Sequence, residues 1–315
     1  TFDQNFKFLI PITIILIPAF LGIFYGLITL CFIISKPKKI VSSFFSFSLF
    51  FGIFEFIRGS ILTGFPWNLI AYSFSNHLEI LSITSFIGTY GFNLFCISLF
   101  TSPAVFILRD SKKDIWVCIV FLMMPLLFYM HGSSYKETFN TSDVISYNYK
   151  VRAIGSNISL DRFYSNIDPA SAINDLIEIS EPNKNEKTIF VWPEGILPEI
   201  SQKELFKYKW LFEKSFNKNH LLLIGINNQT INKESINYFN SLSIYDHNLE
   251  LLNFYNKVNL VPFGEFLPFE NISKAFGLRS ITNNYQSFSK GNKREIMEIN
   301  REGFSIKILP LICYE

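Results

Sequence analysis

Three loops in the second half of the chain carry side chains with complementary chemistry. Glu194 follows the apolar run 188–192, and Lys257 follows the alternating run 251–255. Cys313 comes at the end of the apolar run 304–312. A thiol with a pKa of about 8.5 attacks as its thiolate, so a carboxylate must take its proton, while a fixed ammonium stabilises the thiolate and a developing oxyanion. If these loops meet at one point, their side chains are suited to nucleophilic acyl transfer.

Each of the three residues also has a plainer interpretation. Glu194 fits a turn acid, Lys257 a solvated charge and Cys313 a small core residue. The coincidence of all three at strand ends favours a site over three unrelated positions. The hypothesis therefore depends on whether the fold brings the three loops together.

The sequence offers little support for other chemistries. It contains no Gly-rich phosphate loop, Gly-x-Ser-x-Gly elbow or dinucleotide fingerprint. The four histidines are scattered without metal-ligand spacing: His77, His131, His220 and His247. We therefore expect neither a metal nor an organic cofactor. The net charge of +2 gives no reason to expect nucleic acid as a partner.

The elements that must position the three loops alternate between strand and helix patterns. Strands are expected at 150–158, 188–192, 221–226 and 304–312, with a hairpin formed by 238–245 and 251–255. Helical spacing marks 173–179 and 202–217. Strands interleaved with helices predict an α/β layered domain over residues 144–315.

The first part of the chain has a different composition. Residues 1–130 hold 8 Lys/Arg and 5 Asp/Glu, whereas residues 131–315 hold 20 and 21. Four apolar segments, 8–34, 41–57, 78–108 and 115–130, approach or exceed the roughly 20 residues that span a bilayer. Residues 1–131 are therefore predicted to be a transmembrane domain, followed by a polar tether over 132–143. Buried core helices of a large soluble protein are the alternative.

Basic residues predict which side of the membrane each loop occupies. Lys36, Lys38 and Lys39 lie between the first two segments, and Arg109, Lys112 and Lys113 lie between the last two. Both clusters fall on the cytoplasmic side if all four segments cross. The second half then lies outside the cytoplasm, where Cys313 is its single cysteine and has no partner for an internal disulfide.

Several motifs resemble one enzyme family over most of the chain. In the first half they are 55–59 (EFIRG), 63–68 (TGFPWN) and 88–91 (GTYG). In the second half they are 192–194 (WPE), 238–241 (YFNS), 257–268 (KVNLVPFGEFLP), 287–291 (SFSKG) and 312–315 (ICYE). The chain resembles the apolipoprotein N-acyltransferases, which combine membrane helices with a domain of the nitrilase, or carbon–nitrogen hydrolase, superfamily. The implied fold is a multi-pass helical membrane domain followed by an α-β-β-α sandwich, incomplete at its C-terminus.

The resemblance implies a role for each matching residue. Glu194 would be the general base, Lys257 the cation beside the oxyanion and Cys313 the nucleophile. Glu265 matches the second glutamate, which holds the lysine and the base in place. Residues that match pocket-supporting positions are Asn240, Tyr314 and Glu315, and the candidate lipid or substrate contacts are Trp67 and Tyr164.

The implied reaction proceeds in two transfers. Cys313 takes an acyl chain from a phospholipid as a thioester and passes it to the α-amino group of the S-diacylglyceryl-cysteine of an apolipoprotein. This is the last step of lipoprotein maturation, at the bacterial inner membrane with the catalytic domain on the periplasmic side. The expected partners are thus a phospholipid acyl donor, diacylglyceryl-modified apolipoproteins and the membrane.

The chain departs from the family pattern in two respects. Tyr164 stands where the family usually has Trp. Family members also have further helices ahead of residue 8 and roughly a hundred residues after the motif at 312–315, so the chain is expected to be a truncated fragment with little activity alone. Two alternatives to the acyltransferase remain: a membrane-tethered nitrilase-like amidase, or an inactive truncated fragment of the acyltransferase.

Overall fold

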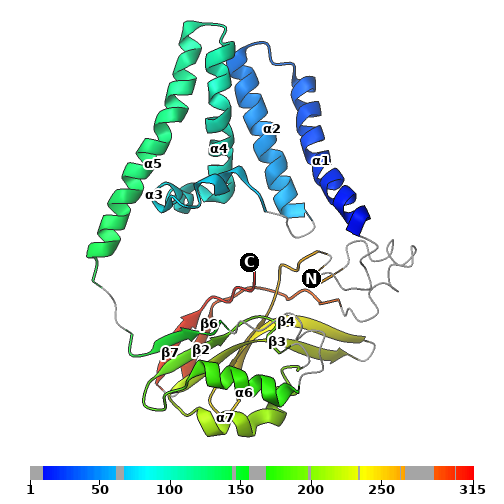
Figure 1. The fold of residues 1–315 in the computed structure, drawn as a ribbon, viewed down its shortest axis with the longest axis vertical. Helices are drawn as coiled ribbons and strands as arrows, with labels where there is room; N and C mark the ends of the chain where they lie inside the picture. Colours follow the sequence, from blue (N-terminus) through cyan, green and yellow to red (C-terminus); the bar gives the residue numbers. More distant parts are fainter. Residues whose placement is uncertain are drawn as a thin grey trace. The chain divides into compact units, whose positions relative to one another are not determined.

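A computed structural model describes residues 10–61, 67–143, 147–155, 168–197, 200–232, 235–262, 264–266, 287–301 and 303–315. The chain divides into two compact units, residues 1–144 and 145–315. The first contains the long helices and the second contains every strand assigned in the described residues (Figure 1).

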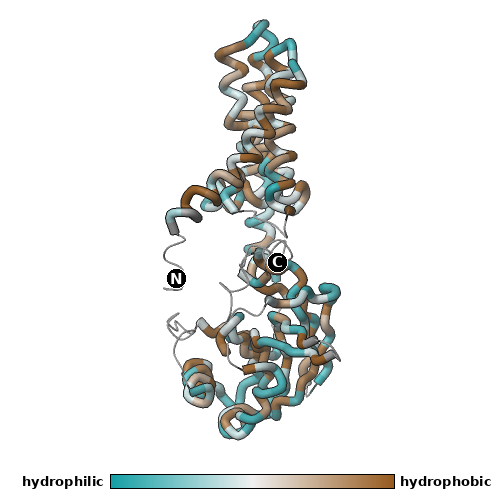
Figure 2. Tube along the Cα trace, turned by 90° about the vertical axis from the view of Figure 1, so that its right-hand side faces the viewer, coloured by the Kyte–Doolittle hydropathy of each residue, from teal (hydrophilic) through white to brown (hydrophobic). Residues whose placement is uncertain are grey.

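The first unit is built from four long helices. They are α1 (Ile10–Ser35), α2 (Ile40–Ser60), α4 (Thr84–Leu108) and α5 (Ile115–Thr141). By length and composition, four helical segments in this unit can cross a membrane. Apolar residues dominate these helices, as Figure 2 shows, and many large ones are exposed, including Leu16, Phe45, Ile107 and Leu127. Such exposure suits contact with lipid better than contact with water.

Two expectations about this unit are corrected. The segment expected as one helix from residue 78 is divided into α3 (Leu78–Leu81) and α4, and Gly88 kinks α4 with φ +69°. The polar tether expected at 132–143 is helical up to Thr141. At Gly132 an added Cβ would come within 1.9 Å of the Glu79 carbonyl oxygen, so this part of α5 packs closely on α3. Lys136 then pairs with Glu79 at 2.7 Å.

A buried ion pair lies among these apolar helices. Arg58 and Glu55 are 3% and 2% exposed, and Arg58 Nη2 lies 2.8 Å from Glu55 Oε2. The hydroxyl of Tyr25 on α1 donates to the same carboxylate at 3.2 Å. Arg58 Nη1 also donates to the backbone carbonyl of Trp67 at 3.0 Å. The pair therefore ties α2 to α1 and to the segment that follows α2.

The second unit contains a five-stranded mixed sheet in the order β1-β2-β3-β4-β5. Its strands are β1 (Lys150–Ala153), β2 (Thr188–Trp192), β3 (His220–Asn232), β4 (Ser235–Tyr245) and β5 (Leu251–Asn256). β1, β2 and β3 run parallel to one another, and β4 is antiparallel to both β3 and β5. A separate hairpin pairs β6 (Met297–Arg301) with β7 (Phe304–Ile308).

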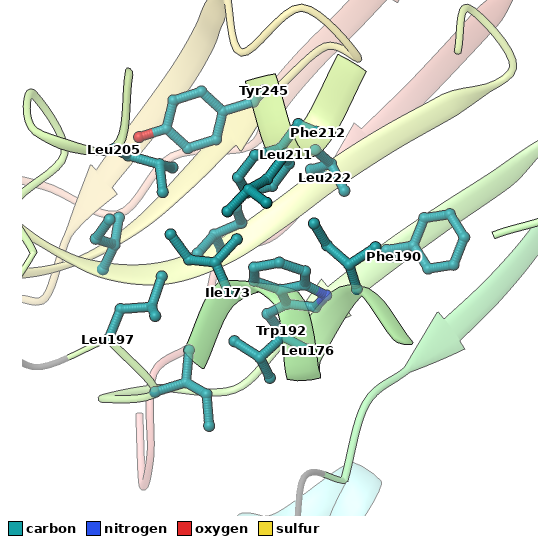
Figure 3. Close-up of a cluster of buried hydrophobic side chains, with 14 of the residues drawn as sticks. Ile173, Leu176, Phe190, Trp192, Leu197, Leu205, Leu211, Phe212, Leu222 and Tyr245 are labelled. Atoms are coloured by element: carbon teal, nitrogen blue, oxygen red, sulfur yellow. The ribbon is translucent and has the colours of Figure 1, made fainter. Parts of the chain in front are cut away.

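The alternation of side chains gives the sheet two apolar faces. Phe190, Trp192 and Leu222 pack with α6 (Pro169–Ser180) and α7 (Lys209–Ser215), as Figure 3 shows for part of this cluster. The opposite face presents residues such as Ile189 and Leu221 to the β6–β7 hairpin. The unit thus has a helix layer, a central sheet and a second strand layer, and the predicted order of a helical unit followed by an α/β unit is confirmed.

Several boundaries differ from the prediction for physical reasons. The helix expected at 202–217 is a short 3₁₀ turn (Leu205–Tyr208) followed by α7. Before the turn, the Glu204 carboxylate accepts the backbone N–H of Ser201 at 3.0 Å. The last strand ends at Ile308 rather than 312, before Pro310, which has no N–H for a strand ladder. The chain therefore reaches Cys313 through irregular backbone.

Candidate active site

Glu194 is placed by a sharp turn at the end of β2. The strand ends at Trp192, Pro193 breaks it, and Gly195 takes a left-handed φ of +66°. On the neighbouring strand β3, a Cβ at Gly225 would lie 2.7 Å from the Glu194 Cα and 2.7 Å from the Pro193 carbonyl oxygen. The glycine therefore leaves room for the backbone that carries Glu194. The Glu194 side chain keeps 37% of its surface exposed.

Lys257 directly follows β5 and is almost completely buried, with 1% of its side chain exposed. Its Nζ lies 3.0 Å from Glu265 Oε1 and 3.4 Å from Glu194 Oε1. Burial by itself would lower the pKa of Lys257, but the charge of Glu194 and the hydrogen bond and charge of Glu265 outweigh burial and raise that pKa. The side chain is therefore a fixed ammonium at neutral pH.

Asn240 on β4 links the two carboxylates. Its side-chain Nδ2 donates to Oε1 of Glu194 and to Oε1 of Glu265, the oxygens that also face Lys257. The other oxygen of Glu265 accepts the backbone N–H of Val261 at 2.7 Å. This network fixes both carboxylates around one ammonium and leaves the more exposed one, Glu194, open to a reactant.

Cys313 is exposed and lies in a strained turn. Its φ of +58° is uncommon for a residue with a Cβ and costs of order 1 kcal/mol or more. Cys313 makes the smallest of the contributions that raise the pKa of Lys257, after those of Glu194 and Glu265. The next residue, Tyr314, places its ring 5.8 Å from Lys257 Nζ and donates its hydroxyl to the Leu260 carbonyl at 3.1 Å.

Glu315 joins the thiol loop to the lysine loop. Its Oε1 accepts the backbone N–H groups of Val258 at 3.0 Å and Asn259 at 2.9 Å. Its Oε2 accepts the N–H of Ile312 at 3.1 Å. Burial alone would raise the pKa of Glu315, but these hydrogen bonds and that of the Tyr255 hydroxyl lower it. Glu315 is therefore an ionised carboxylate that holds both loops.

Two glycines contribute to the site without having been assigned a role from the sequence. Gly225 gives Glu194 its space, as described above. Gly291 donates its N–H to the Lys257 carbonyl at 2.8 Å, and a Cβ there would meet the Asn256 carbonyl oxygen at 2.0 Å. Gly291 belongs to the 287–291 motif, and this motif was the sequence feature that could have identified it as a site residue. Nothing in the sequence around Gly225 marked it, because it lies inside a regular strand.

Trp67 and Tyr164 are the two remaining predicted residues. Trp67 belongs to the helical unit and is 52% exposed, and Tyr164 lies outside the described residues. Within the described ranges, His, Cys, Asp and Glu side chains form no group of three able to hold a metal ion. The structure thus brings together Glu194, Lys257, Glu265 and Asn240, with Cys313, Tyr314 and Glu315 on an adjacent loop. This arrangement can ionise a thiol and stabilise an oxyanion.

Comparison with known proteins gives matches to one family across the chain. The family model described as the apolipoprotein N-acyltransferase N-terminal domain matches residues 2–100. An apolipoprotein N-acyltransferase of Rhodopseudomonas palustris is 26% identical over 99% of this chain and 59% of its own length. One from Bradyrhizobium diazoefficiens is 24% identical over 98% of this chain and 59% of its own length. The chain therefore spans about three fifths of the length of these curated relatives.

Among solved structures, an amidase from Nesterenkonia sp. AN1 in complex with acrylamide aligns at 12% identity with a TM-score of 0.24. The alignment covers 51% of this chain and 52% of that one. The family match and the sequence relatives confirm the resemblance inferred from the motifs: by sequence, this chain is similar to the apolipoprotein N-acyltransferases.

Proposed function

We propose that this chain carries out N-acyl transfer from a phospholipid to the α-amino group of a diacylglyceryl-modified apolipoprotein. The observation that carries the proposal is the buried Lys257 ammonium, 3.4 Å from the more exposed Glu194 carboxylate, on a loop that Glu315 joins to the loop of the exposed Cys313. The names of the sequence relatives supply the substrate class. Four helices able to cross a membrane suit an enzyme whose two substrates are both lipid-anchored.

In the first transfer, Glu194 takes the proton of the Cys313 thiol and the thiolate attacks the carbonyl carbon of a phospholipid ester. Lys257 stabilises the oxyanion that forms. The carbon–oxygen bond to the glycerol then breaks, and the leaving alkoxide takes the proton from Glu194. The products are a lysophospholipid and an acyl thioester on Cys313.

In the second transfer, the neutral α-amino group of the apolipoprotein attacks the thioester carbonyl. The carbon–sulfur bond breaks and an amide bond forms. Glu194 accepts the proton that the amine loses and returns it to the thiolate, so the enzyme ends in its starting state. Glu265 and Asn240 hold Glu194 and Lys257 in place throughout, because they contact these groups directly or through a shared carboxylate oxygen.

The same proposal includes the location of the chemistry. The basic clusters at Lys36–Lys39 and Arg109–Lys113 favour a cytoplasmic position for those two loops. The α/β unit then lies on the periplasmic side of the inner membrane, where diacylglyceryl-modified lipoproteins are anchored. Trp67 and Tyr164 remain candidate contacts for the acyl chain or the lipoprotein.

A reconstituted transfer assay tests this proposal. The protein in proteoliposomes is supplied with a phospholipid and a diacylglyceryl-cysteine lipopeptide, and the lipopeptide is analysed by mass spectrometry. A mass increase of one acyl chain on the α-amino group, lost in Cys313→Ser and Glu194→Gln, is expected. An unmodified lipopeptide together with hydrolysis of small amides would favour the amidase alternative and reject acyl transfer.

A further inference from the structure

We propose that Arg294 and Tyr255 are positioning residues for the transfer reaction and that they act through the carboxylate of Glu315. The inference rests on the proposed function for its reaction, although its geometry stands independently. Neither residue belongs to the group of side chains around Lys257. Their effect would be to keep the lysine loop and the thiol loop at a fixed separation.

The contacts converge on one buried carboxylate. Arg294 Nη2 lies 3.0 Å from Glu315 Oε1, and the Glu315 side chain has no exposed surface. The Tyr255 hydroxyl lies 2.8 Å from Oε1 and 2.9 Å from Oε2 of the same carboxylate. The proximity of Tyr255 and Glu315 raises the pKa of Arg294, so the guanidinium stays charged. Arg294 and Tyr255 thus both contact the carboxylate of Glu315.

The Glu315 carboxylate also hydrogen-bonds to the backbone of the lysine loop and of the thiol loop. It accepts the N–H of Val258, the residue after Lys257, and the N–H of Ile312, the residue before Cys313. Tyr255 adds a direct link, since its hydroxyl oxygen accepts the Val258 N–H at 3.3 Å. A carboxylate that accepts from both loops can hold them only while its own orientation is fixed.

Arg294 supplies what that orientation requires. A buried carboxylate needs a compensating charge, and a guanidinium provides one in a directional, planar form. Without it Glu315 would keep its backbone hydrogen bonds but could rotate about its last torsion or admit water. Small displacements of reacting groups lower rates steeply, on the order of a hundredfold for about 1 Å.

Arg301 offers a matched control from the same unit. Its exposed fraction is 38%, close to the 30% of Arg294, and it also pairs with acidic side chains. Its partners are Asp246 and Glu250 in the turn between β4 and β5, and neither contacts Lys257, Glu315 or the thiol loop in the interactions described above. Loss of Arg301 therefore removes a similar ion pair and leaves the contacts of Glu315 described above unchanged.

The test compares Arg294→Met, Tyr255→Phe and Arg301→Met in whole protein purified in detergent micelles without phospholipid. All carry Cys31, Cys96 and Cys118 replaced by Ser, so that Cys313 is the remaining thiol. The first measurement is the iodoacetamide alkylation rate of Cys313 at one neutral pH, without lipid substrate turnover. The second is the rate of thioester formation at varied phospholipid concentration, which separates kcat from KM.

Arg294→Met and Tyr255→Phe are expected to slow alkylation and to lower kcat on the order of tenfold, with KM for the phospholipid unchanged. Arg294→Lys should recover part of the loss, because it keeps the charge but not the planar fork. Arg301→Met should match the parent protein in both measurements. If Arg294→Met does not fold, Tyr255→Phe decides the question alone.

Equal rates for Arg294→Met, Tyr255→Phe and Arg301→Met would overturn the proposal. So would a rise in KM with kcat unchanged, which would place Arg294 in substrate binding instead. A parent protein that forms no thioester would count against the proposed function, while the alkylation rates would still decide whether these residues position Cys313.

Discussion

The ammonium of Lys257 lies 3.4 Å from the carboxylate of Glu194, although 63 residues separate them in the chain. The contact exists because β2 and β5 both belong to one sheet, with β3 and β4 between them. Lys257 is buried while Glu194 keeps an open side. The pair thus combines a fixed charge with a base that a reactant can reach.

Replacing Lys257 by Met should abolish most of the acyl transfer. The substitution removes the cation beside the oxyanion, and loss of one such group typically costs about 10²–10³ in rate. It also leaves two carboxylates facing each other through Asn240 without a neutralising charge. The measurement is single-turnover thioester formation, compared with Lys257→Arg. A loss of less than about threefold in Lys257→Met would contradict the assigned role.

Gly225→Ala should reduce activity through the backbone rather than through chemistry. The added Cβ would meet the Glu194 Cα and the Pro193 carbonyl at 2.7 Å, so the base must move. We expect a loss of roughly a hundredfold in kcat. Gly155→Ala is the matched control, because its Cβ would meet nothing within 4 Å. Equal activity in the two variants would show that the close approach at Gly225 is unimportant.

The hydrogen bonds that the ionised Glu315 carboxylate accepts should make the stability of the α/β unit sensitive to acid. The folded-state pKa of Glu315 is lowered from 4.5, so its stabilisation is present above that value and is lost as pH falls through the lower folded pKa. Hydrogen bonds to a charged group suggest a contribution of about 1–3 kcal/mol. Urea unfolding at pH steps below about 4.5 measures it. Glu315→Gln should flatten this part of the pH dependence, and an unchanged slope would refute the assignment.

The buried pair in the helical unit predicts an asymmetric mutational response. Arg58→Met leaves the Glu55 carboxylate buried and unneutralised, which typically destabilises by about 3–5 kcal/mol. The double variant Arg58→Met with Glu55→Gln removes both charges and should recover much of that loss. Thermal unfolding in detergent, read by tryptophan fluorescence, compares the parent protein, Arg58→Met, Glu55→Gln and the double variant. Additive losses in the double variant would mean that the two side chains do not depend on each other.

The sequence was informative where pattern and chemistry were both local. Strand β2 was predicted with its observed bounds, because five apolar residues end at Pro193. The residues placed at strand ends, Glu194 and Lys257, were found from their types and positions alone. The alternation of strands and helices likewise predicted the order of the α/β unit.

Long-range packing determined the features that sequence patterns did not reveal. Helix α5 continues to Thr141 and packs closely on α3 at Gly132, beside the backbone of Glu79, an approach that no local pattern encodes. The left-handed backbone at Cys313 and the demand for glycine at 225 arise only when separate strands are assembled. Arg294 was overlooked because its partner, Glu315, is 21 residues away on another loop.

Thioester formation on Cys313 tests the central claim most directly. The protein is incubated in vesicles with a phospholipid that bears an alkyne-tagged acyl chain, and the label is then detected with and without hydroxylamine. The account predicts a hydroxylamine-labile label that maps to Cys313 and disappears in Cys313→Ser. A label that persists in Cys313→Ser, or a parent protein that acquires none, would contradict it.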